Sequence, residues 1–267
     1  MAAPQPLYTR DNCTFCGPWR WGLTVFWRTP VSDAPWFADL TRALEADGLR
    51  VLGHRFQEPG VSQFSLSTLA TTAPLFLVKR VKGRLQYLVR KSQPKAFQRN
   101  YALRSFGPAT RAAVEGYIAS QLQRHQMADS RVQATLERLQ INCPEVDLSR
   151  PRGTSHGIYW YNLHVVLVHQ ERWREVREDV LEQVKSMVEG VCRKKEYLLS
   201  RAGILADHIH LAIGCPIEVS PCDIALSFLN NLAYAHGMKP VFQFGAFAGT
   251  FGEYHQGAVV SDELGSV

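Results

Sequence analysis

Two histidines in the segment 206–211 (ADHIHL) have the spacing that places both side chains on one face of a β-strand. Side chains alternate between the two faces of a strand, so His208 and His210 point one way while Ile209 points the other way, toward a core. Two adjacent imidazoles can bind a divalent cation. A half-exposed strand with two ordinary histidines has the same pattern, so the spacing alone leaves both interpretations open.

A tyrosine and a glutamine four residues apart form the second group that could do chemistry. Residues 109–126 have the pattern of a helix, and Pro108 stands just inside its start. Tyr117 and Gln121 would then lie one turn apart on the same helix face. A metal ion bound by Gln121 would lie near the Tyr117 hydroxyl. The apolar neighbours in the same stripe are equally typical of a helix that packs a tyrosine into a core.

The positive charge of the chain is concentrated in one segment. The 267 residues carry 30 Lys and Arg against 24 Asp and Glu, yet no acidic residue lies between Glu58 and Glu115. Aromatic residues are interleaved with the cations there, so bases could stack beside phosphate-binding groups. We expect nucleic acid as the partner, and the predicted DNA-binding residues are Lys79, Arg80, Lys82, Arg84, Arg90, Lys91, Lys95, Arg99 and Arg104.

The order of predicted elements occurs twice along the chain. Strands are expected at 20–28, 50–55, 62–69, 158–169, 198–201 and 205–214, and helices at 35–48, 75–90, 109–126, 132–139, 176–194 and 222–236. In each half a strand, a helix and a strand come before a further strand and helix, which fits a split β-α-β layer. We therefore predict an α+β fold with two ferredoxin-like domains, each with an antiparallel sheet and helices on one face.

The predicted domain boundaries follow from this repeat. Residues 1–19 form an N-terminal extension, residues 20–127 a first domain with the tyrosine helix, residues 128–156 a linker, and residues 157–267 a second domain with the histidine pair. No apolar run reaches the roughly 20 residues that a membrane span needs, and the N-terminus lacks the features of a signal peptide. We expect a cytoplasmic protein without a membrane partner, whose six cysteines stay reduced.

Three motifs in this order resemble one family. Residues 206–214 (ADHIHLAIG) resemble the HUH motif (His, bulky hydrophobe, His) of the single-tyrosine transposases of insertion sequences, including the REP-associated tyrosine transposases. Residues 161–176 are similar to the first strand of that family and its exit, and residues 78–91 to its basic helix. Residues 100–121 are similar to the segment that leads into its catalytic helix, whose signature Tyr-Ile-x-x-Gln is matched by residues 117–121.

The resemblance implies roles for these residues. Tyr117 would be the nucleophile toward a phosphodiester of single-stranded DNA, and His208, His210 and Gln121 would bind Mg²⁺ or Mn²⁺. Such a cation withdraws charge from the phosphate, which otherwise repels nucleophiles. A tyrosine nucleophile gives a 5′-phosphotyrosine intermediate, which conserves the bond energy for rejoining.

Each half lacks what the other half has. Gln63 and Ser65 stand where the second half has its histidines, and only 13 residues follow Tyr254, too few for a second catalytic helix. Members of the family are dimers that exchange this helix. We therefore expect a monomer that acts as an internal pseudo-dimer, with one composite site. Tyr254 and Tyr101 correspond to each other in the two halves, and both are expected to be structural residues.

Two other functions fit the same sequence. The chain could be a non-catalytic or domesticated protein that binds single-stranded DNA or hairpins without cleaving them. It could also be an unrelated ferredoxin-like regulator or scaffold with an incidental histidine pair. Metal affinity at the histidines distinguishes the nuclease from the binding protein, and salt-sensitive DNA binding argues against the regulator. Cys13 and Cys16 form half of a zinc site at most.

Overall fold

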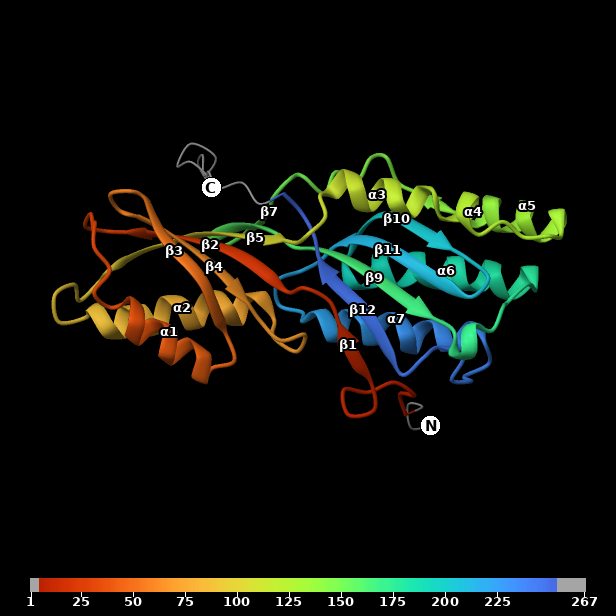
Figure 1. Cartoon of the computed structure of the whole chain (residues 1–267), viewed down its shortest axis with the longest axis horizontal. Coiled ribbons are helices and arrows are strands. Elements are labelled where there is room, and N and C mark those ends of the chain that lie inside the picture. The colour runs from red at the N-terminus through yellow and green to blue at the C-terminus, as the bar shows by residue number, and fades with distance from the viewer. Residues whose placement is uncertain (1–4, 254–267) are drawn as a thin grey trace.

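The computed structural model describes residues 5–253, and these residues form two six-stranded sheets flanked by helices (Figure 1). The sheet orders are β3-β4-β2-β5-β8-β7 and β1-β12-β9-β11-β10-β6. Four strands of each sheet, β3-β4-β2-β5 and β10-β11-β9-β12, have the order of the split β-α-β fold. The expected α+β class with two ferredoxin-like domains is confirmed.

The first domain begins with a strand, a helix and a strand, as expected. Its elements are β2 (Arg20–Trp27), α1 (Phe37–Ala46), β3 (Arg50–Glu58), β4 (Val61–Ser67), α2 (Pro74–Val89) and β5 (Phe97–Phe106). Strands β3, β4, β2 and β5 are paired in an antiparallel manner. Leu77, Val81 and Leu85 recur every four residues along α2 and are fully buried, so the basic helix predicted here is amphipathic.

The second domain repeats this order of elements after three connecting helices and three short strands. The connecting elements are α3 (Arg111–Ala119), α4 (Gln121–Arg124), α5 (Ser130–Leu139), β6 (Ile141–Asn142), β7 (Arg152–Thr154) and β8 (Gly157–Trp160). The repeated elements are β9 (Asn162–Val168), α6 (Glu178–Lys195), β10 (Leu198–Ile204), β11 (His208–Gly214), α7 (Pro221–Ala235) and β12 (Gly245–Thr250), with a 3₁₀ turn at Gln170–Arg172.

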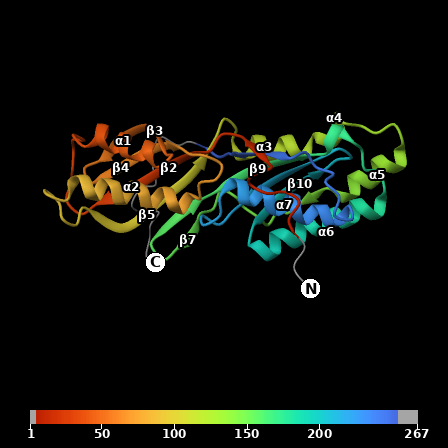
Figure 2. The same ribbon diagram turned by 90° about the horizontal axis from the view of Figure 1, so that it is seen from below.

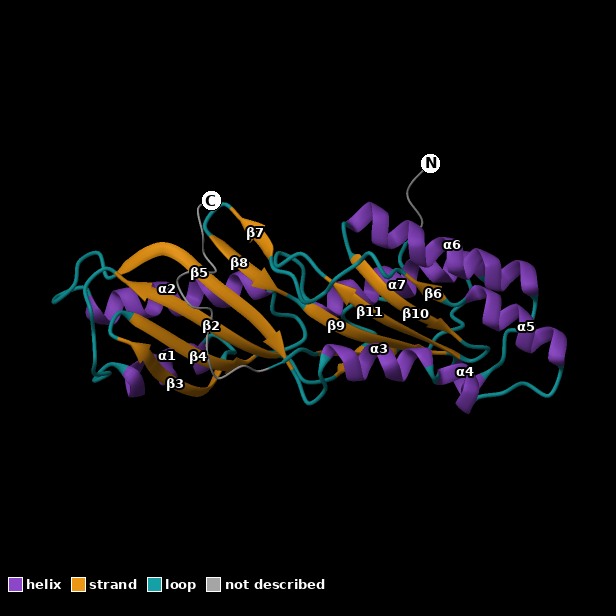
Figure 3. Ribbon diagram, turned by 90° about the horizontal axis from the view of Figure 1, so that it is seen from above, coloured by secondary structure: helices purple, strands orange, loops and turns teal. Residues whose placement is uncertain are grey.

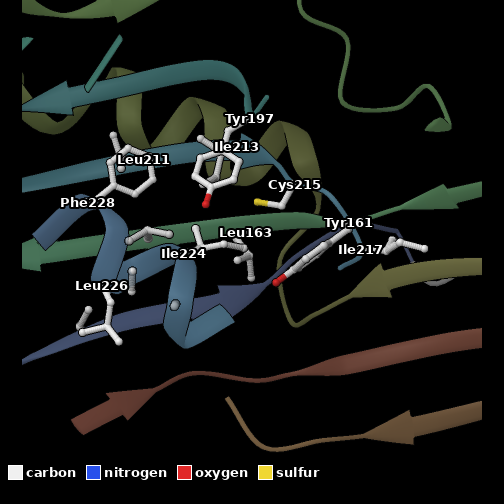
Figure 4. Close-up of a cluster of buried hydrophobic side chains, with 14 of the residues drawn as sticks. Tyr161, Leu163, Tyr197, Leu211, Ile213, Cys215, Ile217, Ile224, Leu226 and Phe228 are labelled. Atoms are coloured by element: carbon white, nitrogen blue, oxygen red, sulfur yellow. The ribbon is translucent and has the colours of Figure 1, made fainter. Parts of the chain in front are cut away.

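Both sheets carry their long helices on the same side of the molecule. Helices α1 and α2 lie beneath the first sheet and α6 and α7 beneath the second, as the view from below shows (Figures 1 and 2). The side chains on this face of the second sheet are apolar, and they pack against α7 in a cluster that includes Leu163, Leu211, Ile213 and Phe228 (Figure 4). Within residues 5–253, no helix is both long and apolar enough to cross a membrane.

Helix α3 takes a different position, on the opposite face of the second sheet. It follows β5 of the first domain but packs across β10 and β11 of the second (Figure 3). The crossing point is narrow, since a Cβ atom at Gly107 would lie 2.0 Å from the carbonyl oxygen of Thr250. The chain that leaves β5 thus passes directly against the chain that leaves β12, and no residue larger than glycine fits there.

Two strands also cross the expected domain boundaries. Residues 1–19 were expected to form an N-terminal extension, but they contain β1 (Thr14–Cys16), which pairs in parallel with β12 of the second sheet. The strand expected over residues 158–169 is divided at Tyr161: β8 pairs in parallel with β5 of the first sheet, and β9 pairs with β11 of the second. At the division the Asn162 amide donates to the Ser105 hydroxyl, 2.9 Å away, in place of a ladder bond.

Candidate functional site

The two predicted histidines lie next to each other on the outer face of β11, under helix α3. His208 and His210 are each 4% exposed, and their ring centroids are 4.8 Å apart. Ile209 points into the core on the α7 side, as the alternation of the strand predicts. The outer face is therefore polar and the inner face apolar, and both are buried, the outer one under α3 and the inner one against the core on the α7 side.

His210 has one ring nitrogen occupied and the other free. Its Nδ1 lies 3.1 Å from Nε2 of His164 on the neighbouring strand β9, and the two rings are stacked. Its Nε2 is buried without a hydrogen-bond partner among the residues that the structure describes. Burial lowers the pKa of His210 to about 3 and that of His164 to about 4, so both imidazoles are neutral at physiological pH.

His208 is oriented by a carboxylate. Its Nδ1 lies 2.6 Å from Oδ1 of Asp207, and the other oxygen of Asp207 accepts from Nε of Arg172 at 3.0 Å. Burial lowers the pKa of His208, with the Asp207 hydrogen bond acting in the opposite direction. A carboxylate on Nδ1 is the arrangement that fixes the tautomer of metal-binding histidines, and it directs Nε2 outward as the ligand atom.

Tyr117 from helix α3 faces this pair of histidines. Its ring centroid lies 5.4 Å from that of His210 and 6.0 Å from that of His164, with the rings nearly perpendicular. Its side chain is 41% exposed, so a large substrate can reach it. The guanidinium of Arg124 lies 5.5 Å from the ring centroid. A residue that follows the first sheet is thus brought to a site on the second sheet.

Gln121 lies at a break in the helix that was expected to be continuous over residues 109–126. Helix α3 ends at Ala119, and α4 begins after Ser120. Gln121 is buried, and its amide nitrogen donates to the Tyr117 carbonyl at 3.1 Å. The amide oxygen is therefore the atom with which Gln121 could bind a cation.

The two histidine side chains are donors of the type that divalent cations bind, whereas the hydrogen bond described for the Gln121 side chain is to the Tyr117 carbonyl. Two neutral imidazoles present Nε2 atoms, and the orphaned Nε2 of His210 is a buried polar atom that a ligand would satisfy. Across residues 5–253 there is no group of three or more His, Cys, Asp or Glu side chains placed to hold a metal. A metal at the histidine pair would need a third protein ligand of a different residue type, such as the amide of Gln121.

Sequence reasoning missed two residues of this cluster. His164 lies opposite Ala212 in the register of β9 with β11, which places it on the face of His210. The signal that could have found it is the pairing of two adjacent strands, each with a histidine. His125, just after α4, has its ring 5.4 Å from that of His208. His169 lies elsewhere, against Trp173 and His236.

The predicted DNA-binding residues lie on α2, on the following turn and on β5, so most of them are on the side of the first sheet away from α3 (Figure 1). Lys82 donates to the carbonyls of Gln98 and Arg99 at 2.9 Å, and Arg84 pairs with Asp47. Burial lowers the pKa of Lys82 to about 8. The guanidinium groups of Arg80, Arg90 and Arg104 lie over aromatic rings. Of the predicted DNA-binding residues, the exposed ones are Lys79, Arg80, Arg90, Lys91, Lys95 and Arg99.

The other tyrosines and the cysteine pair lie apart from this cluster. Tyr101 is buried, and its hydroxyl lies 3.3 Å from that of Thr154, while Tyr254 falls outside the described residues. Cys13 is buried and Cys16 exposed, and both are free thiols.

One family model matches part of the chain. Residues 158–234 match the family described as "Transposase IS200 like". Part of the second domain is thus similar to IS200-like transposases. The matched segment runs from β8 to α7 and includes both histidines of β11, whereas Tyr117 and Gln121 precede it. This match suggests a transposase-like function on DNA.

Comparisons with curated sequences and with solved structures do not add to the match with IS200-like transposases. No curated protein sequence is significantly similar to the chain. A solved structure described as a glycine cleavage system transcriptional repressor is 9% identical over 88% of this chain and 99% of its own, with a TM-score of 0.24. A protein of unknown function from Galdieria sulphuraria is 11% identical over 87% and 98%, with a TM-score of 0.23. Likenesses this weak carry no argument.

Proposed function

We propose that the protein is a metal-dependent endonuclease and strand transferase that cleaves single-stranded DNA near a hairpin through a 5′-phosphotyrosine on Tyr117. The chain would act as an internal pseudo-dimer with one composite active site. The observation that carries the proposal is the position of Tyr117, which reaches His210 from the opposite domain with ring centroids 5.4 Å apart. The family match of the second domain supports the same chemistry.

Tyr117 is the nucleophile in this proposal. Its hydroxyl oxygen forms a bond to phosphorus while the bond from phosphorus to the 3′ oxygen breaks. The phenol loses its proton and the leaving 3′ oxygen gains one, so the products are a phosphotyrosine and a free 3′-hydroxyl. The exposed position of Tyr117 allows a DNA strand to approach, and α3 holds the ring in place because the neighbouring Ile118 is buried.

The histidines, with Gln121, would hold Mg²⁺ or Mn²⁺. When bound, the cation would withdraw charge from a phosphate oxygen and orient the phosphodiester. Asp207 holds His208 through Nδ1, and His164 does the same for His210, so both Nε2 atoms are preset before any ligand arrives. The pairing of Asp207 with Arg172 keeps this carboxylate in its orienting position.

The experiment that tests the proposal is covalent capture. The full chain is mixed with Mn²⁺ and a pool of single-stranded hairpins from the DNA that flanks its gene, and adducts stable in SDS are mapped by mass spectrometry. We expect the modified peptide to contain Tyr117 and Tyr117→Phe to give no adduct. Tyr87→Phe is the matched control, because Tyr87 is also an exposed helical tyrosine of the first half. An adduct that persists in Tyr117→Phe would contradict the proposal.

The single site per chain is tested by mixing two inactive variants. Tyr117→Phe and His210→Ala each remove one half of the composite site. If Tyr117 and the histidines of the same chain act together, the mixture stays inactive. Recovery of adduct in the mixture would show that chains exchange the helix between molecules.

The alternative function is that of a non-catalytic binding protein for single-stranded DNA or hairpins. The exposed cations on α2 and the following turn favour it, because they suit a phosphate backbone and lie away from the histidines. Tight, salt-sensitive hairpin binding without adduct and without Mn²⁺ affinity would select this alternative.

A further inference from the structure

A cavity lies beside the C-terminal end of α7, away from Tyr117. It has a volume of about 490 Å³, and its lining includes Trp173, Arg177, Val180, His236 and Lys239. No role in the proposed cleavage involves any of these residues. The cavity has three different walls: one aromatic, one polar and buried, and one cationic at the rim.

The polar wall is unsatisfied. His236 is 7% exposed, and both of its ring nitrogens lack a hydrogen-bond partner within residues 5–253. The nearest carboxylate oxygen, on Glu175, lies 3.6 Å from Nδ1, which is beyond hydrogen-bond length. Burial lowers the pKa of His236 to about 4, so the ring is neutral and offers one donor and one acceptor. A buried group of this kind is costly unless a ligand completes it.

The aromatic and charged walls suit different parts of one ligand. Trp173 is 44% exposed although it is large and apolar, and its ring centroid lies 6.1 Å from that of His236. Glu175, 1% exposed, lies behind His236, and its carboxylate accepts from the Arg177 guanidinium at 2.7 and 3.0 Å. The exposed Lys239 adds a positive charge to the cavity lining. The cavity is thus complementary to a flat aromatic group with hydrogen-bonding edges inside and a phosphate outside.

The loop that carries Trp173 is joined to the candidate active site. Arg172 of this loop pairs with Asp207, which orients His208, and the His169 amide donates to the Asp207 carbonyl at 2.9 Å. Glu171 and Arg172 both have φ above +50°, a conformation that is uncommon for residues other than glycine. The cavity and the histidine pair are therefore fixed relative to each other by one short segment.

We infer that this cavity receives one unpaired nucleobase of the single-stranded DNA substrate, stacked on Trp173 and hydrogen-bonded to His236, with the adjacent phosphate at Lys239 and Arg177. The inference rests on the proposed function for the identity of the DNA strand. It adds a site that reads one base at a set distance from the cleaved phosphodiester.

The test uses the full chain with Tyr117→Phe, so that binding is measured without cleavage. The probe is a set of single-stranded oligonucleotides from the pool, with 2-aminopurine or an abasic residue at each position in turn. We expect one position where 2-aminopurine is quenched and where loss of the base weakens binding about 5- to 100-fold. Added Trp173→Ala should remove both effects, and Tyr234→Ala, which removes an exposed aromatic side chain of α7, should leave them unchanged.

A second variant tests the polar wall without a risk to folding. His236→Phe keeps the ring and removes the two unpaired nitrogens, so the fold should be retained. We expect stacking at the same position with reduced discrimination among the four bases. If DNA binds and Tyr117 forms an adduct, but no position depends on Trp173, the base site is wrong and the cleavage proposal stands.

The four deoxynucleoside monophosphates are a separate probe that needs no cleavage. Their contact with the protein is measured by saturation-transfer NMR with the wild-type and Trp173→Ala chains. Suppose that no adduct forms with any hairpin. A signal that is lost in Trp173→Ala would then support the base site and contradict the nuclease proposal. The absence of a Trp173-dependent signal in that case overturns the base site as well.

Discussion

The two ferredoxin-like domains have the same strand order and the same helices on one face, but their other faces differ. In the second sheet this face carries His208 and His210 and is covered by α3. In the first sheet the equivalent residues are Gln63 and Ser65, and Arg55 donates to Gln63 at 2.8 and 2.6 Å. The face of the second sheet presents the Nε2 of His210, unpartnered among the described residues, to a ligand. On the face of the first sheet, Gln63 is hydrogen-bonded to Arg55 instead.

This difference between the two sheets shows which copy of a duplicated fold can retain an active site. Gly203 and Gly53 occupy equivalent register positions, opposite His210 and Ser65. A Cβ atom at Gly203 would lie 3.2 Å from the Ile118 side chain of α3, whereas at Gly53 nothing within the described residues lies within 4 Å. The histidines thus remain on the sheet that receives the tyrosine helix, as a single composite site requires.

The largest expected difference between the domains concerns adduct formation. His208→Ala or His210→Ala should reduce the adduct to below detection, because each removes one of the two proposed histidine ligands of the metal. Gln63→Ala and Ser65→Ala, at the equivalent positions, should retain it. The capture assay with the four variants side by side measures this. Equal loss in both sets would mean that the first sheet also takes part in the chemistry.

A smaller effect is expected from the residue that orients His210. His164→Leu removes the partner of His210 Nδ1 and should weaken Mn²⁺ binding about 10- to 100-fold. Arg20 holds the same register position in the first sheet, so Arg20→Leu is the matched control. Isothermal titration with Mn²⁺ distinguishes them. Unchanged affinity in His164→Leu would show that His164 only fills space.

Much of the fold follows from the sequence because the signals are local. The stripes of α2 and α6 and the alternation of β2 and β11 predict these elements closely. The break at Tyr161 was missed because each side is a good strand, and only the switch of partners from β5 to β11 divides them. The pairing of β1 with β12 is equally non-local, with more than 200 residues between them.

The sequence predicts which residues belong to the candidate site more readily than it predicts where they lie in the fold. His208 and His210 share a face by strand geometry, but their burial does not follow from the alternation, because it comes from α3, which covers that face. That α3 crosses to the second sheet followed only from the family resemblance, since no local pattern encodes it. His164 needed the register between β9 and β11, which alternation in one strand cannot supply.

The two glycines offer a test of how firmly α3 is docked. Gly203→Val should lower the free energy of unfolding by about 1–3 kcal/mol, because the added methyl groups press against Ile118. Gly53→Val should change it by less than about 0.5 kcal/mol, since the site is open in the described structure. Urea unfolding of the two variants measures this. Equal effects would indicate that α3 does not stay on the second sheet.

The smallest expected effect is on acid stability. The pKa of His210 is lowered to about 3 by burial, while the unfolded chain has the ordinary value near 6.5. Between these values the unfolded state binds the extra proton, so the free energy of unfolding falls as the pH decreases. His210→Gln should reduce this slope by at most about 1.4 kcal/mol per pH unit. Ser65→Gln, at the equivalent position, should leave the slope unchanged in urea unfolding at pH 4–6.

The central claim is that Tyr117 and the histidine pair form one site across the two domains. The most direct measurement labels the chain with 3-fluorotyrosine, assigns Tyr117 by its Phe variant, and follows the ¹⁹F signals as paramagnetic Mn²⁺ is added without DNA. We predict that the Tyr117 signal broadens first, that the Tyr87 signal stays sharp, and that His210→Ala abolishes the effect. A Tyr117 signal that stays sharp while Mn²⁺ binds the histidines would contradict the account.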